Sequence, residues 1–162
     1  MRPRMNRRAR WVALLLAAAL VAPVWAAAPV PGQHLPALHL KDQHDREWYV
    51  RADTRLVIFA AGRKASNLAM AVLGQQAKGF LATRHAVYLA DMSKMPGFIT
   101  RSFALPSLKE QPFEVGVVLD DKTLEGWPRQ DDALTLIRLD NGRVVGHEYA
   151  TTEAQLRAAL GL

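Results

Sequence analysis

The stretch that decides the fold is residues 134–160, which read LTLIRLDNGRVVGHEYATTEAQLRAAL. Two runs rich in strand-forming residues, 134–139 and 144–149, lie on either side of the pair Asn141-Gly142. Asn-Gly between two such runs is the strongest local signal for a tight β-hairpin, because both residues tolerate positive φ. The stretch therefore predicts two adjacent antiparallel strands near the end of the chain.

A helix is expected directly after this hairpin. Thr152 and Gln155 fit a capping box, in which the side chains of two residues three apart satisfy free backbone N–H groups at the start of a helix. The apolar residues that follow at helical spacing are expected to face the sheet: Leu156, Ala159 and Leu160.

Three nearly continuous apolar runs stand upstream, TRLVIFAA at 54–61, HAVYLA at 85–90 and FEVGVVL at 113–119. Such short runs, rich in β-branched and aromatic residues, are typical of strands buried on both faces of a sheet. Ser66 or Asn67 is expected to cap a helix between the first two runs. The inward-facing residues of that helix would be Leu68, Val72, Leu73, Ala77, Phe80 and Leu81.

A second helix is expected between the later two runs. Pro96 suits its first position, and Pro106 is expected to end it. Phe98, Ile99 and Phe103 would face inward. With an opening hairpin formed by residues 37–40 and 47–50, the order of elements predicts one α/β domain. Its mixed sheet would carry helices on both faces.

This order resembles the thioredoxin-like superfamily. Residues 134–160 are similar to the closing strand–hairpin–strand–helix part of a thioredoxin. The opening segment LPALHLKDQHDREWYV, residues 35–50, resembles the first hairpin of the extracytoplasmic TlpA-like and peroxiredoxin-like branch. The resemblance covers nearly all of residues 37–162 and implies a three-layer α/β/α sandwich.

The resemblance places the family's CxxC motif on Lys64-Ala65-Ser66-Asn67 and its cis-proline on Leu134. Neither position keeps the family's residue, and the whole chain contains no cysteine. Thiol–disulfide exchange and thiol peroxidase chemistry need a thiolate, so both activities are excluded.

The same alignment predicts one candidate ligand site at the amino terminus of the helix that would carry the motif. Free backbone N–H groups and the helix dipole favour an anion there, and two cations add to the effect. The candidate residues are Gly62, Arg63, Lys64, Ser66 and Asn67. The alternative interpretation is a solvated turn whose basic side chains face water.

Residues 1–26 match a secretory signal peptide. Arginines at positions 2, 4, 7, 8 and 10 precede twelve apolar residues, 11–22, which is shorter than the roughly 20 residues that span a bilayer. We expect cleavage after Ala26, an extended lead-in at 27–36 and a periplasmic domain at 37–162. An uncleaved anchor and twin-arginine export, which Arg7-Arg8 would suit, stay open as alternatives.

Loss of that segment changes the charge of the protein. The full chain has a net charge of +6, and without the five arginines 16 basic residues face 15 acidic ones. A nearly neutral protein has no broad electrostatic footprint for nucleic acid or an anionic membrane, so neither is expected as a partner.

No metal or cofactor is expected. His34, His39 and His44 are five residues apart, and an odd spacing along a strand places side chains on alternate faces. Glycine-rich nucleotide motifs are missing from the sequence. The sequence thus favours a redox-inactive binding or accessory module whose partner is an envelope protein or a small anion. The alternatives are a thiol-independent or cofactor-dependent enzyme, such as a flavin-linked oxidoreductase, and a subunit of a larger envelope complex.

Overall fold

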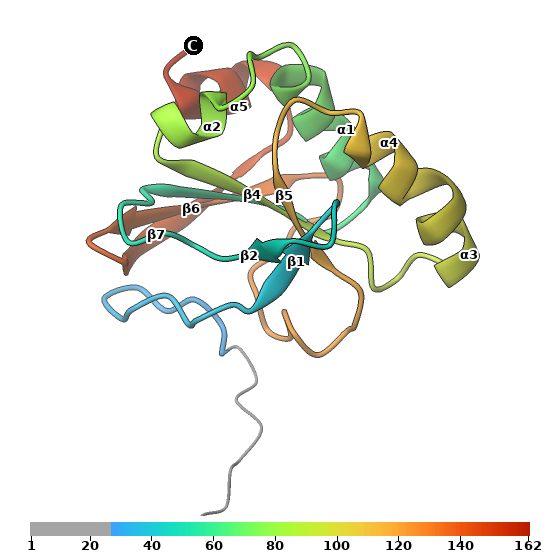
Figure 1. Ribbon diagram of the computed structural model, residues 1–162. Helices are drawn as coiled ribbons and strands as arrows, with labels where there is room; N and C mark the ends of the chain where they lie inside the picture. The colour runs from blue at the N-terminus through green and yellow to red at the C-terminus, as the bar shows by residue number, and fades with distance from the viewer. Residues whose placement is uncertain (1–26) are drawn as a thin grey trace, which may run out of the picture.

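A computed structural model describes residues 27–162, which form one seven-stranded mixed sheet (Figure 1). The strand order across the sheet is β2-β1-β5-β4-β3-β6-β7. The strands are β1 (Leu40–Asp42), β2 (Glu47–Trp48), β3 (Leu56–Ala60), β4 (Ala86–Asp91), β5 (Val115–Val118), β6 (Leu134–Asp140) and β7 (Arg143–Ala150). The predicted mixed α/β sheet is confirmed.

The middle of the sheet is its most buried part. Strand β3 pairs in parallel with β4 and antiparallel with β6, and all five of its residues are buried. Strand β4 also pairs in parallel with β5. Parallel strands must be joined by crossovers, so the helices that link β3 to β4 and β4 to β5 lie over the sheet rather than at its edge.

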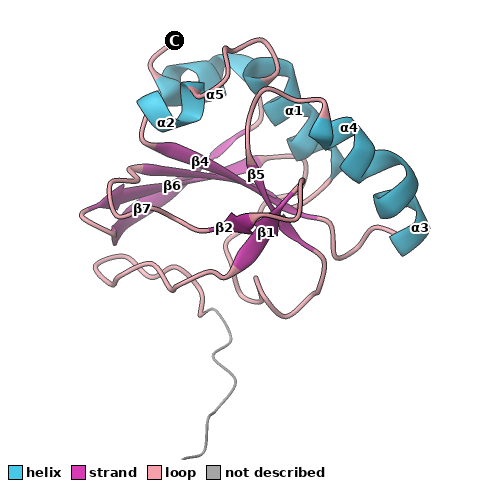
Figure 2. Cartoon of the chain, in the orientation of Figure 1, coloured by secondary structure: helices cyan, strands magenta, loops and turns pink. Residues whose placement is uncertain are grey.

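A layer of helices covers one face of the sheet (Figure 2). These helices are α1 (Arg63–Leu73), α2 (Phe80–Thr83), α3 (Gly97–Ile99), the π-helix η1 (Thr100–Ala104), α4 (Leu105–Lys109) and α5 (Glu153–Leu160). Leu56, Ile58 and Ala60 of β3 point into this layer. There they pack with buried residues of α1, α2, α4 and α5. Because successive side chains of a strand point to opposite faces of the sheet, the other residues of β3 belong to a second core on the opposite face.

The opposite core, around Val57 and Phe59, is covered differently from the prediction. Leu124 and Trp127 bury it from the segment between β5 and β6, and Leu38 does so from the chain before β1. Within residues 27–162, no helix contributes to this second core. The expectation of helices on both faces is therefore wrong for this face, whose outer layer is made of irregular segments.

The closing hairpin and helix are as the local signals predicted. Asn141 and Gly142 have φ values of 47° and 76°, which is the left-handed conformation that a tight two-residue hairpin turn requires. Thr152 and Gln155 form the capping box, with the Gln155 N–H donating to the Thr152 hydroxyl. The opening hairpin is also present, with Leu40 opposite Trp48.

The first helix differs at both ends from the expectation. It begins at Arg63, and its N-cap is Gly62, four or five residues before the expected caps Ser66 and Asn67. It ends at Leu73, and a separate helix α2 starts only after Gly79, which has a φ of 85°. That left-handed glycine starts a new helix axis, so Phe80 and Leu81 do not continue α1.

The second helix also departs from its prediction, because Pro106 lies inside it. The π-helix η1 directly precedes α4, in which Pro106 occupies the first turn. The wider π-turn removes the clash between a proline ring and the preceding carbonyl that would otherwise break the helix. Phe98 of α3 and Phe103 of η1, which were expected to face inward, are 64% and 65% exposed.

The lead-in pairs with the turn that joins β6 and β7. The N–H of Gly32 donates to the Val144 carbonyl at 2.8 Å, and the N–H of Leu35 donates to the Gly142 carbonyl at 2.9 Å. The expected signal peptide, residues 1–26, lies outside the described residues. Among residues 27–162, none of the helices is long and apolar enough to cross a membrane.

Candidate functional site

The predicted ligand site lies where helix α1 starts, at the carboxyl end of strand β3. The N-cap, Gly62, has no side chain to satisfy the first turn, and its carbonyl accepts the N–H of Ser66 at 2.9 Å. In the first turn of a helix, the backbone N–H groups have no helical carbonyl one turn earlier to which they can donate. This applies to the N–H groups of Arg63, Lys64 and Ala65. They therefore provide unused donors at the positive end of the helix dipole.

These donors open into a cavity of about 300 Å³, which we call the α1 cleft. One wall is formed by residues 61–65, which follow β3 and start α1, and the other by residues 129–133, which lead into β6. Three cations, Arg63, Lys64 and Arg129, and two acids, Asp131 and Asp132, line the cleft. It therefore has an excess of one positive charge.

Lys64 is held by an ion pair across the cleft. Its ammonium group lies 2.7 Å from the Asp132 carboxylate, and the side chains are 73% and 59% exposed. This hydrogen bond and the Coulomb attraction of Asp132 raise the pKa of Lys64. An incoming anion must therefore compete with Asp132 for Lys64, which the sequence did not indicate.

Arg129 is the cleft residue that sequence reasoning missed. Its guanidinium lies 3.1 Å from the Asp91 carboxylate, which is only 5% exposed, and donates to the Leu124 carbonyl at 3.0 Å. It also stacks over the Phe59 ring at 5.3 Å. A carboxylate at the end of a buried strand needs a cationic partner. The position of Asp91 in the sequence could therefore have indicated that a basic side chain lies beside it.

Ser66 and Asn67 do not line the cleft. Ser66 is half-buried on the sheet side of α1, beside the hydroxyl of the fully buried Tyr88, and Asn67 is exposed. Burial raises the pKa of Tyr88 to about 12, and the neighbouring Ser66 lowers it only in part. The two hydroxyl groups do not meet hydrogen-bond geometry. Of the five predicted residues, the structure brings together Gly62, Arg63 and Lys64.

This arrangement offers backbone N–H donors and basic side chains to a ligand. The position of the family's first cysteine holds Lys64, and no thiol exists in the chain. The one histidine–carboxylate contact of the described part joins His85 to Asp53 at 3.0 Å, at the start of β4 and far along the strand from α1. Within that part, no three His, Asp or Glu side chains form a group that could hold a metal ion.

Comparisons with known proteins agree with this fold. No family model and no curated protein matches the chain. Solved structures do match: a thiol:disulfide interchange protein, DsbE, of Chlorobium tepidum is 15% identical over 83% of this chain and 100% of its own, with a TM-score of 0.55. A thioredoxin from Neisseria meningitidis is 13% identical, with 78% and 86% covered and a TM-score of 0.54.

A peroxidoxin, BcpB, of Mycobacterium tuberculosis is 12% identical, with 82% and 95% covered and a TM-score of 0.53. At these identities the likeness shows the fold, which is thioredoxin-like. Since the chain has no cysteine, it cannot perform the thiol–disulfide chemistry that needs a thiolate.

Proposed function

We propose that this protein is an exported, redox-inactive binding or accessory module of the periplasm, and that the α1 cleft recognises an anionic group. The group would be a carboxylate or phosphate, carried by a small molecule or by an acidic loop of an envelope protein. The observation that carries the proposal is the uncapped first turn of α1, whose free N–H groups open into the cleft.

The charges of the cleft support a ligand with a single small anionic group. Arg63 lines the cleft, is exposed and makes no ion pair among the described residues, so it is available to a ligand. Asp131 and Asp132 also line the cleft, and their carboxylates would repel a ligand that carries several negative charges. Lys64 and Asp132 are both exposed, and water and salt screen exposed ion pairs, so a ligand can displace Asp132 at small cost.

The test is a titration of inorganic phosphate and acetate, followed by NMR at the backbone amides of Arg63, Lys64 and Ala65. We expect these three signals to shift together. The double variant Arg63→Ala/Lys64→Ala should weaken binding roughly ten- to a hundredfold, because it removes both full charges.

Asp132→Asn provides a test in the opposite direction. It keeps the side-chain shape, and asparagine tolerates the left-handed backbone of position 132, where φ is 61°. Because it releases Lys64, it should tighten binding roughly three- to tenfold. Lys94→Ala, which removes an exposed cation elsewhere, is the matched control and should change nothing. Equal binding by wild type, the double variant and Asp132→Asn would refute the proposal.

A further inference from the structure

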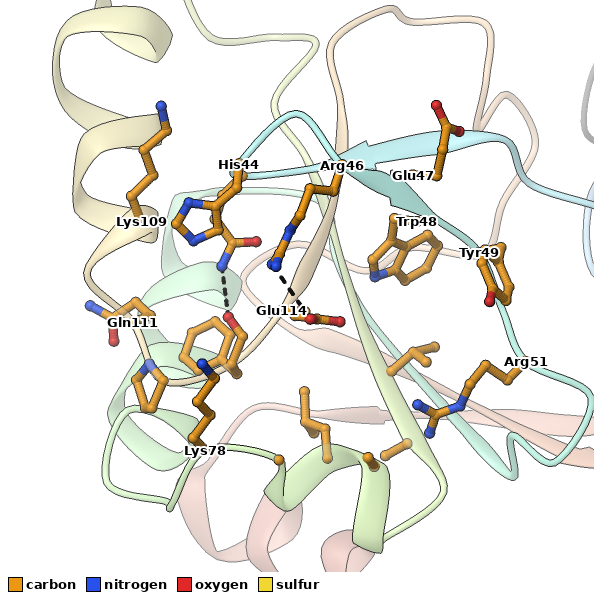
Figure 3. A pocket seen from close by; sticks show the side chains of 18 residues that line it. His44, Arg46, Glu47, Trp48, Tyr49, Arg51, Lys78, Lys109, Gln111 and Glu114 are labelled. Atoms are coloured by element: carbon orange, nitrogen blue, oxygen red, sulfur yellow. Dashed lines mark hydrogen bonds and ion pairs between the residues drawn. The ribbon is translucent and has the colours of Figure 1, made fainter.

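A cavity of about 830 Å³ at the opening hairpin is larger than the α1 cleft, but its walls are largely committed to the fold (Figure 3). Its acid Glu114 lies 3.5 Å from Arg46, whose guanidinium also binds the buried carboxylate of Asp42 at 2.8 Å. Trp48 and Phe113 in its wall are 6% and 7% exposed. The acid therefore shares its partner, and the protein itself already covers these two aromatic side chains.

Two cations of the smaller α1 cleft are also neutralised by acids. The Lys64 ammonium lies 2.7 Å from the Asp132 carboxylate, and the Arg129 guanidinium lies 3.1 Å from the carboxylate of Asp91. Asp91 does not line the cleft, but its charge offsets the positive excess of the residues that do. Neither pair therefore presents a net charge to a ligand.

One cation and one acid of the α1 cleft remain free. Arg63 on the helix wall and Asp131 on the opposite wall are exposed, and neither side chain makes an ion pair or a hydrogen bond within residues 27–162. The backbone N–H groups at the start of α1 add to the positive side. The two walls thus present opposite charges to one cavity, which suits a ligand that carries both a negative and a positive group.

The walls are close enough for a small ligand to touch both. The Lys64 side chain starts on the helix wall and reaches Asp132 on the other, so the gap there is no wider than one extended lysine side chain. The second wall is a tight turn, in which the Ala133 N–H donates to the Gln130 carbonyl at 3.2 Å and Asp131 and Asp132 are the central residues. A short molecule with two charged ends can therefore bridge the walls while neither is reordered.

Small residues form the rest of the cleft. Ala61, Gly62, Ala65 and Ala133 line it, and among the described residues no large apolar side chain does. Its volume of about 300 Å³ is at the lower end of the range of roughly 300–1,000 Å³ found for small-molecule sites. A ligand with a large apolar body would therefore find neither room nor apolar surface.

We propose that the α1 cleft binds a short amino carboxylate, such as a small amino acid, with its carboxylate at Arg63 and the first turn of α1 and its ammonium group at Asp131. This inference rests on the proposed function and names the class of its ligand. It also separates that ligand from phosphate, whose additional negative charge would meet Asp131 with no ammonium group to balance it.

The test compares glycine with acetate, which lacks the ammonium group, and with methylammonium, which lacks the carboxylate. Binding is followed by NMR at the backbone amides of residues 63–65 and of Asp131, in protein purified after expression of the full chain. We expect glycine to shift the amides of both walls and acetate to shift those of the helix wall. Glycine should bind roughly three- to tenfold tighter than acetate or methylammonium, because the additional charge-assisted hydrogen bond is partly screened at an exposed site.

Asp131→Asn tests the position of the ammonium group. It should abolish the preference for glycine and should not weaken acetate binding, because it removes a carboxylate that repels acetate. Asp121→Asn, which removes an exposed acid outside the cleft, is the matched control and should bind both ligands as wild type does. Asp132→Asn releases Lys64 and should tighten both ligands alike.

The negative results of the two proposals are distinguishable. Binding of acetate at residues 63–65 without a preference for glycine, or a preference that survives in Asp131→Asn, would overturn this inference and leave the proposed function standing. Amide signals that stay unchanged with both acetate and glycine would overturn the two together.

Discussion

Phe59→Ala is the change that tests the fold most directly. Phe59 is fully buried in the middle of β3, its ring centroid lies 5.6 Å from that of Trp127 in an edge-to-face contact, and Arg129 lies over its face. Truncation of a buried phenylalanine costs about 3–5 kcal/mol. The contact with Trp127 adds to the loss, so we expect a value of about 4–5 kcal/mol.

The assay is urea unfolding followed by circular dichroism, with Phe98→Ala as the matched control. Phe98 is 64% exposed in α3, and alanine is a better helix former, so this second truncation should change stability by less than about 0.5 kcal/mol. For a domain of this size, the loss at Phe59 corresponds to a melting temperature lower by roughly 10–20 °C. A cost below about 2 kcal/mol at Phe59, or a similar cost at Phe98, would refute the two-core arrangement.

Two further predictions concern processing and pH. Mass spectrometry of the exported protein should find Ala27 as the first residue, and intact Met1 in the membrane fraction would contradict the expected export. The pKa of Tyr88 is raised to about 12 in the folded state by burial, so the stability associated with its neutral hydroxyl is complete below about pH 10 and is lost as the pH rises toward 12. Absorbance titration should find one tyrosine that ionises near pH 12 and is missing in Tyr88→Phe. Tyr88→Phe should also reduce the loss of stability between pH 10 and 12, and identical profiles for both proteins would contradict this assignment.

The elements that the sequence predicted well are those whose signals are complete within a few residues. The Asn141-Gly142 turn and the Thr152–Gln155 capping box depend only on local backbone chemistry, and both are present. The central strands were recognisable because residues buried on both faces are apolar without interruption, as in Leu56–Ala60.

The elements that were mispredicted depend on contacts or on helical phase. Phe103 was expected inside because α-helical spacing was assumed, and it lies in a π-helix, whose wider turn changes that spacing. In the α1 cleft, Arg63 and Lys64 lie where the alignment placed them, but Asp132 is 68 residues away from Lys64 in the chain. No local pattern indicates that such a pair forms, so the partial neutralisation of the cleft became visible only in the structure.

The pairing of the lead-in with the last hairpin has a consequence for the order in which the protein folds. Gly32 and Leu35 form hydrogen bonds with Val144 and Gly142, which lie more than a hundred positions later in the chain. These hydrogen bonds, which stabilise the beginning of the described chain, can form only after the later residues have been synthesised. Strand β3 likewise gains its second neighbour only when β6 arrives. Non-local pairing of this kind slows folding, because chain closure costs entropy before any contact compensates it. We expect the polypeptide to stay open until its final hairpin is free, and a chain that folds late in this way would fit the export proposed above.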